Sequence, residues 1–327
     1  MKALLIAGGL GTRLRPLTFT RPKHLLPIAQ RPHIEHVLDL LVRHGVTDIV
    51  LLSSYLADAF AAVIERAHQR GIEIEVAHES EPLGTAGALK NAEHLVGEET
   101  FFAFNGDVLT NVDLSALLDF HRASGADGTI LLTPVKDPSA YGVVPTDERG
   151  RVVRFVEKPA PEDAVTNEIN AGVYVLEPSV LSSIPSGRAV SIEREVFPVL
   201  ASRGVLYARS TDAYWMDIGT PEKFLQANLD ALAGRFATDA VARPGPDAVV
   251  AATDVRIDDG ARVSSACLGR GCVVESGALV RNSVLLDGVT VAEGASVVGS
   301  VLGEGVRVGP EAKLDGRTVG DGESVDV

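Results

Sequence analysis

The chain contains 327 residues, of which 46% are hydrophobic and 23% charged, and its formal net charge is −14. This length accommodates one large or two ordinary domains, and the composition is typical of a globular protein that buries a core. Because binding along a nucleic-acid backbone needs a basic surface, the charge argues against a nucleic-acid partner, and any bound anion must be held by local positive charge.

The first part of the chain alternates predicted strands with predicted helices. Residues 2–7 are a short apolar run typical of a buried strand, and from Ile34 apolar residues recur at the spacing of a helix. This order predicts a Rossmann-like, mainly parallel α/β sheet with helices on both faces. Ligands of such sheets bind beyond the carboxyl ends of the strands. Further strands are predicted at 46–52, 72–76 and 100–104, and further helices end at Gly71 and begin near Leu114.

Between Gly128 and Tyr207 predicted strands predominate, which indicates an insertion that adds a second sheet or lobe. A helix is then predicted from Pro221 to about Leu232, and a segment rich in Pro and Gly follows as a linker. The strands of the insertion are predicted at 129–135, 152–156, 172–176 and 205–207. The expected organisation is a catalytic domain over 1–235, a linker over 236–249 and a repeat domain over 250–327.

The last third of the chain repeats with a period of 17 residues. Three interleaved series of aliphatic residues share this period, and glycines follow two of the series by three residues, which predicts three short strands per coil with glycine at the corners. This pattern predicts a parallel β-helix of triangular section. Since a stacked β-helix has open ends that need a cap or a partner, we expect a homo-oligomer. The first series is Ile257, Val274, Val291, Val308 and Val325.

The cysteines and the start of the chain predict a cytoplasmic protein without a membrane partner. Cys267 and Cys272 match no zinc-site spacing and are typical of free thiols in a reducing compartment. The first apolar run is short and is followed by glycines and arginines instead of a cleavage site, so we expect no signal peptide. No apolar stretch approaches the ~18 residues of a membrane span.

The loop after the first strand combines small residues with positive charge. Its sequence, Gly8-Gly9-Leu10-Gly11-Thr12-Arg13, is not a P-loop, and a dinucleotide fingerprint would need glycine in place of Leu14. Small residues expose backbone N–H groups to a phosphate, and Arg13 adds a planar, permanently charged fork. Lys23, eight residues after Arg15, could reach the same phosphates. We therefore predict a phosphate-binding loop, and the alternative is a tight turn with solvated arginines.

Three further charged residues are candidates for chemistry. Lys158 lies between a predicted strand and a proline, and Asp107 follows a predicted strand. Asp217 is flanked by Met216 and Ile218, so it should be partly buried, and a buried carboxylate needs a partner such as a divalent cation. Taken singly, these residues could equally be a surface charge, a turn residue and a helix cap.

The chain contains, in this order, the motifs GGLGTRLRPLT, RPK, EPLGTAGAL, NGD, YGVV, FVEKP, NAGVY, SIEREVFP and WMDIGTP. Along essentially the whole chain, these motifs resemble those of the sugar-1-phosphate nucleotidylyltransferases, and within that family the members that transfer a guanylyl group to mannose 1-phosphate. Because many members carry a C-terminal left-handed β-helix, the resemblance implies that hand for the repeat. It also implies that the phosphate of a sugar 1-phosphate attacks the α-phosphorus of an NTP and releases pyrophosphate, with GTP and mannose 1-phosphate giving GDP-mannose.

The resemblance further implies a role for each candidate residue. Arg13 would hold the leaving pyrophosphate, and Lys23 would stabilise charge around the α- and β-phosphates. Asp107 and Asp217 would coordinate Mg²⁺. The implied sugar-phosphate site consists of Lys158 with Gly142, Glu157 and Asn170. The implied nucleotide site consists of Leu4, Gly8, Gly9, Gly11, Thr12, Glu81, Gly84 and Thr85.

Other functions stay open at this point. A hexapeptide acyltransferase would share the β-helix but uses a histidine base there, whereas all eight histidines lie at or before His121. A non-catalytic regulatory paralogue could keep the fold and lose the charged residues, which are all present here. Thymidylyl, uridylyl or adenylyl transfer to glucose 1-phosphate is the remaining alternative, since nothing in the sequence recognises guanine. We expect the β-helix itself to serve assembly and support, and not chemistry.

Overall fold

The computed structural model describes residues 1–53, 56–160 and 164–326. Contacts divide the chain into two compact units, and neither is one continuous segment. Unit 1 consists of Met1–Gly9 and Val37–Trp215, and unit 2 of Leu10–His36 and Met216–Val327. The opening loop is therefore divided, since its first two glycines belong to unit 1 and the rest of it to unit 2.

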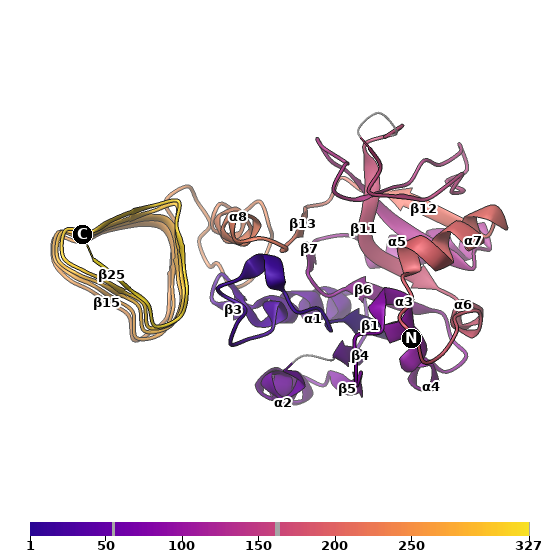
Figure 1. The fold of residues 1–327 in the computed structure, drawn as a ribbon, viewed down its shortest axis with the longest axis horizontal. Helices are drawn as coiled ribbons and strands as arrows, with labels where there is room; N and C mark the ends of the chain where they lie inside the picture. The colour runs from indigo at the N-terminus through magenta and orange to yellow at the C-terminus, as the bar shows by residue number, and fades with distance from the viewer. Residues whose placement is uncertain (54–55, 161–163, 327) are drawn as a thin grey trace. The chain divides into compact units, whose positions relative to one another are not determined.

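Unit 1 is built around a sheet that has nine strands within the described ranges, in the path β10-β9-β11-β6-β1-β4-β5, with β8 paired to β11 and β12 paired to β8 (Figure 1). β6, β1, β4 and β5 are parallel, as predicted. The apolar runs of β6, β1 and β4 are continuous because both faces of these strands are covered, whereas β5 at the edge of the sheet alternates and is mostly exposed. The strands are β1 (Lys2–Ile6), β4 (Asp48–Ser53), β5 (Glu73–His78), β6 (Phe101–Asn105), β8 (Gly128–Pro134), β9 (Gly142–Val143), β10 (Val156–Glu157), β11 (Glu168–Leu176) and β12 (Leu206–Ser210).

The prediction was a second sheet or lobe, and the structure rules out the first of these, because the described residues of the insertion form no separate sheet. β11 instead pairs antiparallel with β6 and with β8, and so extends the same sheet. The physical reason is that the outer edge of β6 carries backbone groups that need partners, and β11 supplies them. The strand predicted at 152–156 is also wrong, because Val152 makes only an isolated bridge to Thr146 and regular pairing begins at Val156.

Helices pack on the strands of this sheet. α3 packs on β1, α2 on β5, and α5 on β8 and β12. None of the helices in the described ranges is long and apolar enough to cross a membrane. The helices are α1 (His33–Arg43), which passes from unit 2 into unit 1, α2 (Ala61–Gln69), α3 (Gly84–Asn91), α4 (Glu93–Val96), α5 (Leu114–Ser124), α6 (Pro178–Ser182), the π-helical turn η5 (Ile192–Val196) and α7 (Phe197–Ser202).

Unit 2 contains the predicted β-helix, and Figure 1 shows its three-sided outline end-on. Successive coils pair in parallel with a step of 17 residues, for example Val274 with Val291 and Val291 with Val308. These valines are buried, whereas Ile257 is 44% exposed because β15 lies in the first coil and, within the described residues, pairs on one side only, with β17. The strands are β14 (Val249–Ala251), β15 (Arg256–Ile257), β16 (Arg262–Leu268), β17 (Val273–Val274), β18 (Leu279–Leu285), β19 (Thr290–Val291), β20 (Ser296–Val298), β21 (Val301–Leu302), β22 (Arg307–Val308), β23 (Lys313–Asp315), β24 (Thr318–Val319) and β25 (Ser324–Val325).

Unit 2 also holds the segment that precedes α1 and the helix α8 (Pro221–Leu232). Asn228 of α8 is fully buried and accepts a hydrogen bond from the Ala29 N–H at 2.8 Å. Its amide nitrogen donates to the carbonyls of Pro27 and Phe224. The N-terminal segment is therefore tied to α8 by one saturated amide, inside the same unit as the β-helix.

Both cysteines are buried free thiols. Cys272 belongs to the core of the β-helix, whereas Cys267 of β16 hydrogen-bonds the backbone of Ala29. Burial raises the pKa of Cys267 to about 12 and that of Cys272 to about 11. Both thiols therefore stay protonated near neutral pH and act as small apolar core residues.

Candidate functional site

The glycine loop and Asp107 leave the central sheet next to each other. Ile6, the last residue of β1, is opposite Asn105, the last residue of β6. The N–H of Gly106 donates to the Ile6 carbonyl at 2.9 Å, so the turn that carries Asp107 begins beside Ala7 and the two glycines of unit 1. This is the carboxyl edge at which open parallel sheets bind ligands.

Leu4 occupies a different environment from the other residues of the predicted nucleotide site. It pairs with Val50 on one side and Ala103 on the other, and its side chain is fully buried in the hydrophobic core of unit 1. Its role in this structure is to hold β1 in the sheet. The glycines that follow it are placed by that packing.

Gly84 and Thr85 begin α3, and the structure gives each a structural partner. Gly84 has φ +70°, and a Cβ added there would lie 2.7 Å from the Val190 carbonyl oxygen. That carbonyl accepts the Ala86 N–H at 2.9 Å, so the first turn of α3 is pressed against the segment before η5. The Thr85 hydroxyl donates to Glu193 at 2.8 Å and accepts from the Ile192 N–H at 2.8 Å. Glu81 is exposed before this turn.

Gly84→Ala should therefore destabilise the protein more than a matched change at Gly125. Both glycines have positive φ, +70° and +59°, but a Cβ at Gly125 would meet no atom within 4 Å. The left-handed conformation alone costs an alanine about 1–2 kcal/mol, and Gly84→Ala adds a backbone clash. Urea unfolding of the two variants measures the difference. Equal losses would show that the contact with Val190 relaxes freely.

Glu79 is a buried carboxylate that sequence reasoning missed. It follows β5, is 4% exposed, and accepts the Leu83 N–H at 3.0 Å. Burial raises the pKa of its carboxyl, while the bond from Leu83 and the charge of His78 act in the opposite direction. Glu79 thus shapes the turn that leads into Gly84. The signal available in the sequence was an acidic residue directly after an alternating strand.

The predicted sugar-binding residues Gly142 and Glu157 lie against each other. They are opposite residues of the antiparallel pair β9–β10. A Cβ added to Gly142 would lie 2.9 Å from Glu157 Oε2 and 2.5 Å from Phe155 Cζ, so only glycine leaves room for this carboxylate. Burial raises the pKa of the Glu157 carboxyl, and the negative charge of Glu193 raises it further.

Lys158 lies directly beside this carboxylate. Its Nζ is 3.8 Å from Glu157 Oε1, and its side chain is 59% exposed. The backbone of Lys158 has φ +50°, which is strained for a residue with a side chain, and its N–H donates to the Tyr141 carbonyl at 3.0 Å. The lysine ammonium is therefore accessible to an anion while its backbone is held in an unusual conformation.

Asn170 belongs to a hydrogen-bonded network at the irregularity in β11. Its Nδ2 donates to the Tyr174 hydroxyl at 2.9 Å, and its Oδ1 accepts the Gly172 N–H at 2.9 Å. The Asn105 side chain also hydrogen-bonds this hydroxyl. Burial raises the pKa of Tyr174 well above 10.0, and the charge of Glu193 adds to that effect. Tyr174 thus links Asn170 to the end of β6, two residues before Asp107.

In unit 1, Glu193 connects Thr85 at the start of α3 with Glu157 and Tyr174. Its Oε2 accepts hydrogen bonds from Thr85 at 2.8 Å and from Ser191 at 2.7 Å, and its charge acts on Glu157 and Tyr174. It lies in the π-helical turn η5, a geometry frequent at functional sites. The motif SIEREVFP contained this residue, but no pattern in the sequence assigned it a partner.

In unit 2, the rest of the opening loop closes on itself. Gly11 has φ +62°, and its carbonyl accepts the Thr18 hydroxyl at 2.8 Å. A Cβ added to Gly11 would lie 3.4 Å from Lys23 Cβ, so the predicted catalytic lysine lies against the glycine, as expected from its position. Thr12 begins the short 3-10 helix η1 (Thr12–Leu14), and Lys23 begins η2 (Lys23–Leu25).

Arg13 and Asp217 lie together around Gly219. A Cβ added to Gly219 would lie 3.0 Å from Arg13 Nη2 and 3.3 Å from Asp217 Oδ2. Asp217 is 15% exposed on its side chain and forms an ion pair through Oδ1 with Lys223, in the first turn of α8. The structure therefore joins two predicted site residues, and adds Gly219 and Lys223, which sequence reasoning missed. Both follow Asp217 within or just after the quoted motif WMDIGTP.

No group of three or more His, Cys, Asp or Glu side chains arranged to hold a metal ion occurs among the residues that the structure describes. Asp107 lies in the turn between β6 and β7 (Val108–Thr110), and Asp217 ends β13 (Trp215–Asp217). Trp215 donates its indole N–H to the Ala171 carbonyl at 2.8 Å, which anchors the start of β13 to β11. Asp107 belongs to unit 1 and Asp217 to unit 2.

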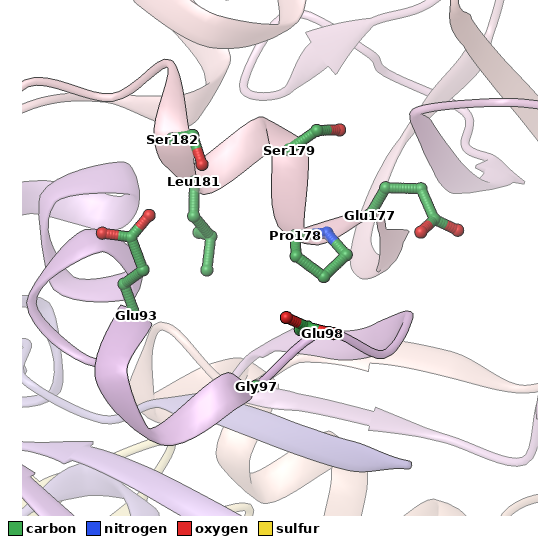
Figure 2. A pocket seen from close by; sticks show the side chains of 8 residues that line it. All are labelled: Glu93, Gly97, Glu98, Glu177, Pro178, Ser179, Leu181 and Ser182. Carbon is green, nitrogen blue, oxygen red and sulfur yellow. The ribbon is translucent and has the colours of Figure 1, made fainter.

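An acidic cavity of about 470 Å³ lies elsewhere in unit 1, between α4 and α6 (Figure 2). Two of its acidic groups already have partners: Glu177 accepts from Thr100 and His121, and Glu93 from Lys90. None of the predicted site residues lines it. Its walls are formed by Glu93, Gly97, Glu98, Glu177, Pro178, Ser179, Leu181 and Ser182.

Comparison with known proteins identifies both parts of the chain. Residues 2–234 match the model of the family described as nucleotidyl transferase, and residues 245–327 match the GMPPB C-terminal domain. The chain is 45% identical over 234 residues to the mannose-1-phosphate guanylyltransferase of Mycobacterium tuberculosis, a match that covers 71% of this chain and 65% of that protein. It is therefore matched over less than two thirds of that relative's length.

Two further likenesses extend this result. The mannose-1-phosphate guanyltransferase of Aspergillus fumigatus is 42% identical over 275 residues, which covers 82% of this chain and 74% of that protein. The crystal structure of HddC from Yersinia pseudotuberculosis complexed with GMP-PN is 31% identical, with a TM-score of 0.60, and covers 69% of this chain and 97% of that chain.

Proposed function

The chain belongs to the nucleotidyl transferase family, and from this premise we propose that it transfers a nucleotidyl group from an NTP to a sugar 1-phosphate. The preferred reaction is GTP plus mannose 1-phosphate to GDP-mannose and pyrophosphate. The observation that carries this choice is the 42–45% identity to relatives named mannose-1-phosphate guanylyltransferases or guanyltransferases, over 71–82% of the chain. A sugar-phosphate oxygen forms the new bond to the α-phosphorus, and the bond from that phosphorus to the bridging oxygen of pyrophosphate breaks.

Two anions must meet in this reaction, so positive charge and alignment would supply most of the catalysis. Arg13 would bind the departing pyrophosphate through its planar fork, and Lys23 would stabilise the α- and β-phosphates. The position of Lys23 against Gly11 supports this role, because a phosphate bound by the loop N–H groups would lie near its ammonium. Lys158, exposed and on a strained backbone, would bind the sugar phosphate.

The sugar hydroxyls would be bound by Glu157, Asn170 and the backbone at Gly142. The close contact between Gly142 and Glu157 supports this proposal, since it places a carboxylate beside an unobstructed peptide group. The nucleotide would be bound by the N–H groups of the glycine loop, with Thr12, Glu81, Gly84 and Thr85 further along. Glu193 would keep Thr85 and Glu157 in a common arrangement through its bonds and its charge.

We propose Mg²⁺ as the cofactor, with Asp107 and Asp217 as its protein ligands. The donor chemistry fits, because Mg²⁺ prefers carboxylate oxygens and is commonly held by one or two carboxylates together with substrate phosphates. Asp217 pairs with the ammonium of Lys223, so this carboxylate already faces a cation, whose place Mg²⁺ would take on binding. When bound, the ion would neutralise phosphate charge during the transfer.

The organisation into a catalytic domain (1–235), a linker (236–249) and a left-handed β-helix (250–327) also stays a proposal. The ranges matched by the two family models, 2–234 and 245–327, support it. We further propose a cytoplasmic homo-oligomer. The first and last coils support assembly, because β15 and β25 each pair with a strand on one side only among the described residues.

A matrix of GTP, ATP, UTP and dTTP against mannose, glucose and galactose 1-phosphates tests the function directly. Pyrophosphate release should be fastest for GTP with mannose 1-phosphate. If pyrophosphate release were fastest with glucose 1-phosphate and another NTP, the protein would instead be a thymidylyl-, uridylyl- or adenylyltransferase. No release with any pair, in folded protein with Mg²⁺, would favour a non-catalytic regulatory paralogue.

A further inference from the structure

The segment that carries Lys23 rests on one corner of the β-helix. At this corner, residues 17 apart form a column of charged side chains along the stack, and two of them bind the segment. Pro16 packs on the same coil, since a Cβ added to Gly320 would lie 3.1 Å from Pro16 Cβ. The column consists of Arg270, Asp287, Glu304 and Asp321.

Asp321 uses both of its carboxylate oxygens. Oδ1 accepts the Glu304 N–H at 2.8 Å, which ties the side chain to the preceding coil. Oδ2 accepts the Arg21 Nη2–H at 2.7 Å and the Thr20 hydroxyl at 2.6 Å. The side chain of Asp321 is 20% exposed. It is therefore held by the β-helix on one side and holds the N-terminal segment on the other.

Arg21 spans two coils. Its Nη2 binds Asp321, and its Nη1 forms an ion pair with Glu304 of the coil before. The arginine side chain is 15% exposed and that of Asp321 20%, so this pair is shielded from water more than an ordinary surface pair, whereas Glu304 is 49% exposed. A planar guanidinium with fixed donors restricts orientation, which a single ammonium would not do.

The chain between Arg21 and Lys23 is stiff. Pro22 has a fixed φ of −60° and precedes η2, whose turn is closed by the bond from the Leu25 N–H to the Pro22 carbonyl at 3.0 Å. The Lys23 carbonyl accepts the Leu26 N–H at 3.1 Å. A displacement of Arg21 would therefore be passed on to the Lys23 backbone and would not be absorbed by the intervening residue.

We propose that Arg21 is a positioning residue: its ion pairs with Glu304 and Asp321 hold Lys23 in the orientation that nucleotidyl transfer requires. This inference rests on the proposed function and gives the β-helix a part in catalysis beyond assembly. A cavity of about 630 Å³ lies beside the contact, lined by residues of both the segment and the β-helix. It provides the space into which the segment could move once the ion pairs of Arg21 are lost.

The main test measures the rate of GDP-mannose formation by Arg21→Ala in the full chain. Misplacing a catalytic group by about 1 Å costs on the order of 100-fold, so kcat should fall about 10- to 100-fold. The KM values should change much less, because Arg21 touches no substrate in the proposal. Arg21→Lys should recover only part of the loss, since one ammonium cannot bind both carboxylates in the same geometry.

Arg270→Ala is the matched control. Arg270 belongs to the same column and binds Asp287 through Nε at 3.0 Å and Nη2 at 2.8 Å, but its partner is on the β-helix itself. The change also removes one positive charge and one arginine–carboxylate pair from this corner. Its kcat should equal that of the unmodified protein. An equal loss in Arg270→Ala would overturn the inference, because the effect would then be general to the β-helix.

Hydrogen exchange provides a readout that does not depend on activity. Amides of residues 16–26 should exchange faster in Arg21→Ala than in the unmodified protein. The double variant Glu304→Gln with Asp321→Asn, which is nearly isosteric, should show the same increase in exchange rate. It replaces Arg21→Ala in this test if that variant fails to fold. If the unmodified protein were inactive but the variants still exchanged faster than it does, the proposed function would be refuted. The contact of Arg21 with the β-helix would nevertheless be established. Unchanged exchange, or unchanged kcat in folded variants of an active protein, would refute the positioning role.

Discussion

Lys23→Ala lowers the turnover of the proposed transfer by about two to four orders of magnitude, the scale of removing a preorganised charge from a transition state. Lys23 lies against Gly11 in the closed opening loop, and its backbone is fixed by the turn η2. In the proposed reaction the ammonium would therefore reach the phosphates without a reorganisation of the chain. Steady-state rates of pyrophosphate release measure the effect.

Three variants separate the charge of Lys23 from its packing. Lys23→Met keeps the apolar stem beside Gly11 and should lose as much turnover as Lys23→Ala, whereas Lys23→Arg should keep part of it. Lys313→Ala removes the same charge from an exposed position of β23 and should leave the rate unchanged. Near-normal kcat in folded Lys23→Ala would refute the catalytic role of this lysine.

Asp217→Asn and Asp107→Asn each raise the Mg²⁺ concentration needed for half-maximal activity, and each lowers turnover at fixed Mg²⁺ by about 100-fold or more, the scale of losing one electrostatic contact to the reacting groups. Since the proposal assigns both carboxylates to one ion, the double variant should be little worse than the worse single variant. Titration of Mg²⁺ in the kinetic assay, and Mn²⁺ binding in the presence of GTP, measure the two effects.

Lys223→Met is the control that the structure supplies for Asp217. Lys223 forms an ion pair with Asp217, so a purely structural role of that pair predicts the same loss from either side. If Asp217 binds the metal, Lys223→Met should change stability or overall rate but should not raise the Mg²⁺ requirement. Additive losses in the double variant, with unchanged metal dependence, would show that the two aspartates do not serve one ion.

The β-helix is the part of the fold that local sequence predicted best. Its period of 17 residues places Val274, Val291 and Val308 in one buried column, and each coil repeats the contacts of the one before. Local sequence also predicted β1 and the glycine loop, because a short apolar run indicates a buried strand and the small residues after it indicate a turn. Such features depend on neighbours in sequence or on a strict repeat, and so the pattern alone determines them.

The chemistry of the candidate site could be predicted only in part. The charged residues Arg13, Lys23 and Lys158 could be named as candidates because a protein of net charge −14 must hold any bound anion by local positive charge. The residues that arrange them were not visible. Glu193 acquires its importance from Thr85, which is 108 residues away, and Gly219 from the guanidinium of Arg13. Sequence spacing carries no information about such pairings.

Only the tertiary structure decided which strands share a sheet and which segments share a unit. The insertion joined the central sheet because β11 satisfies the open edge of β6, a choice among edges that strand propensity does not distinguish. Residues 10–36 belong to the same unit as the β-helix, because Arg21 and Thr20 find their carboxylate partners about 300 residues later in the chain. Hydrogen bonds and ion pairs over such separations depend on where the packed core brings each backbone, whereas the sequence alone determined the parallel strands β1, β4 and β6, the repeat and the charges available to be paired.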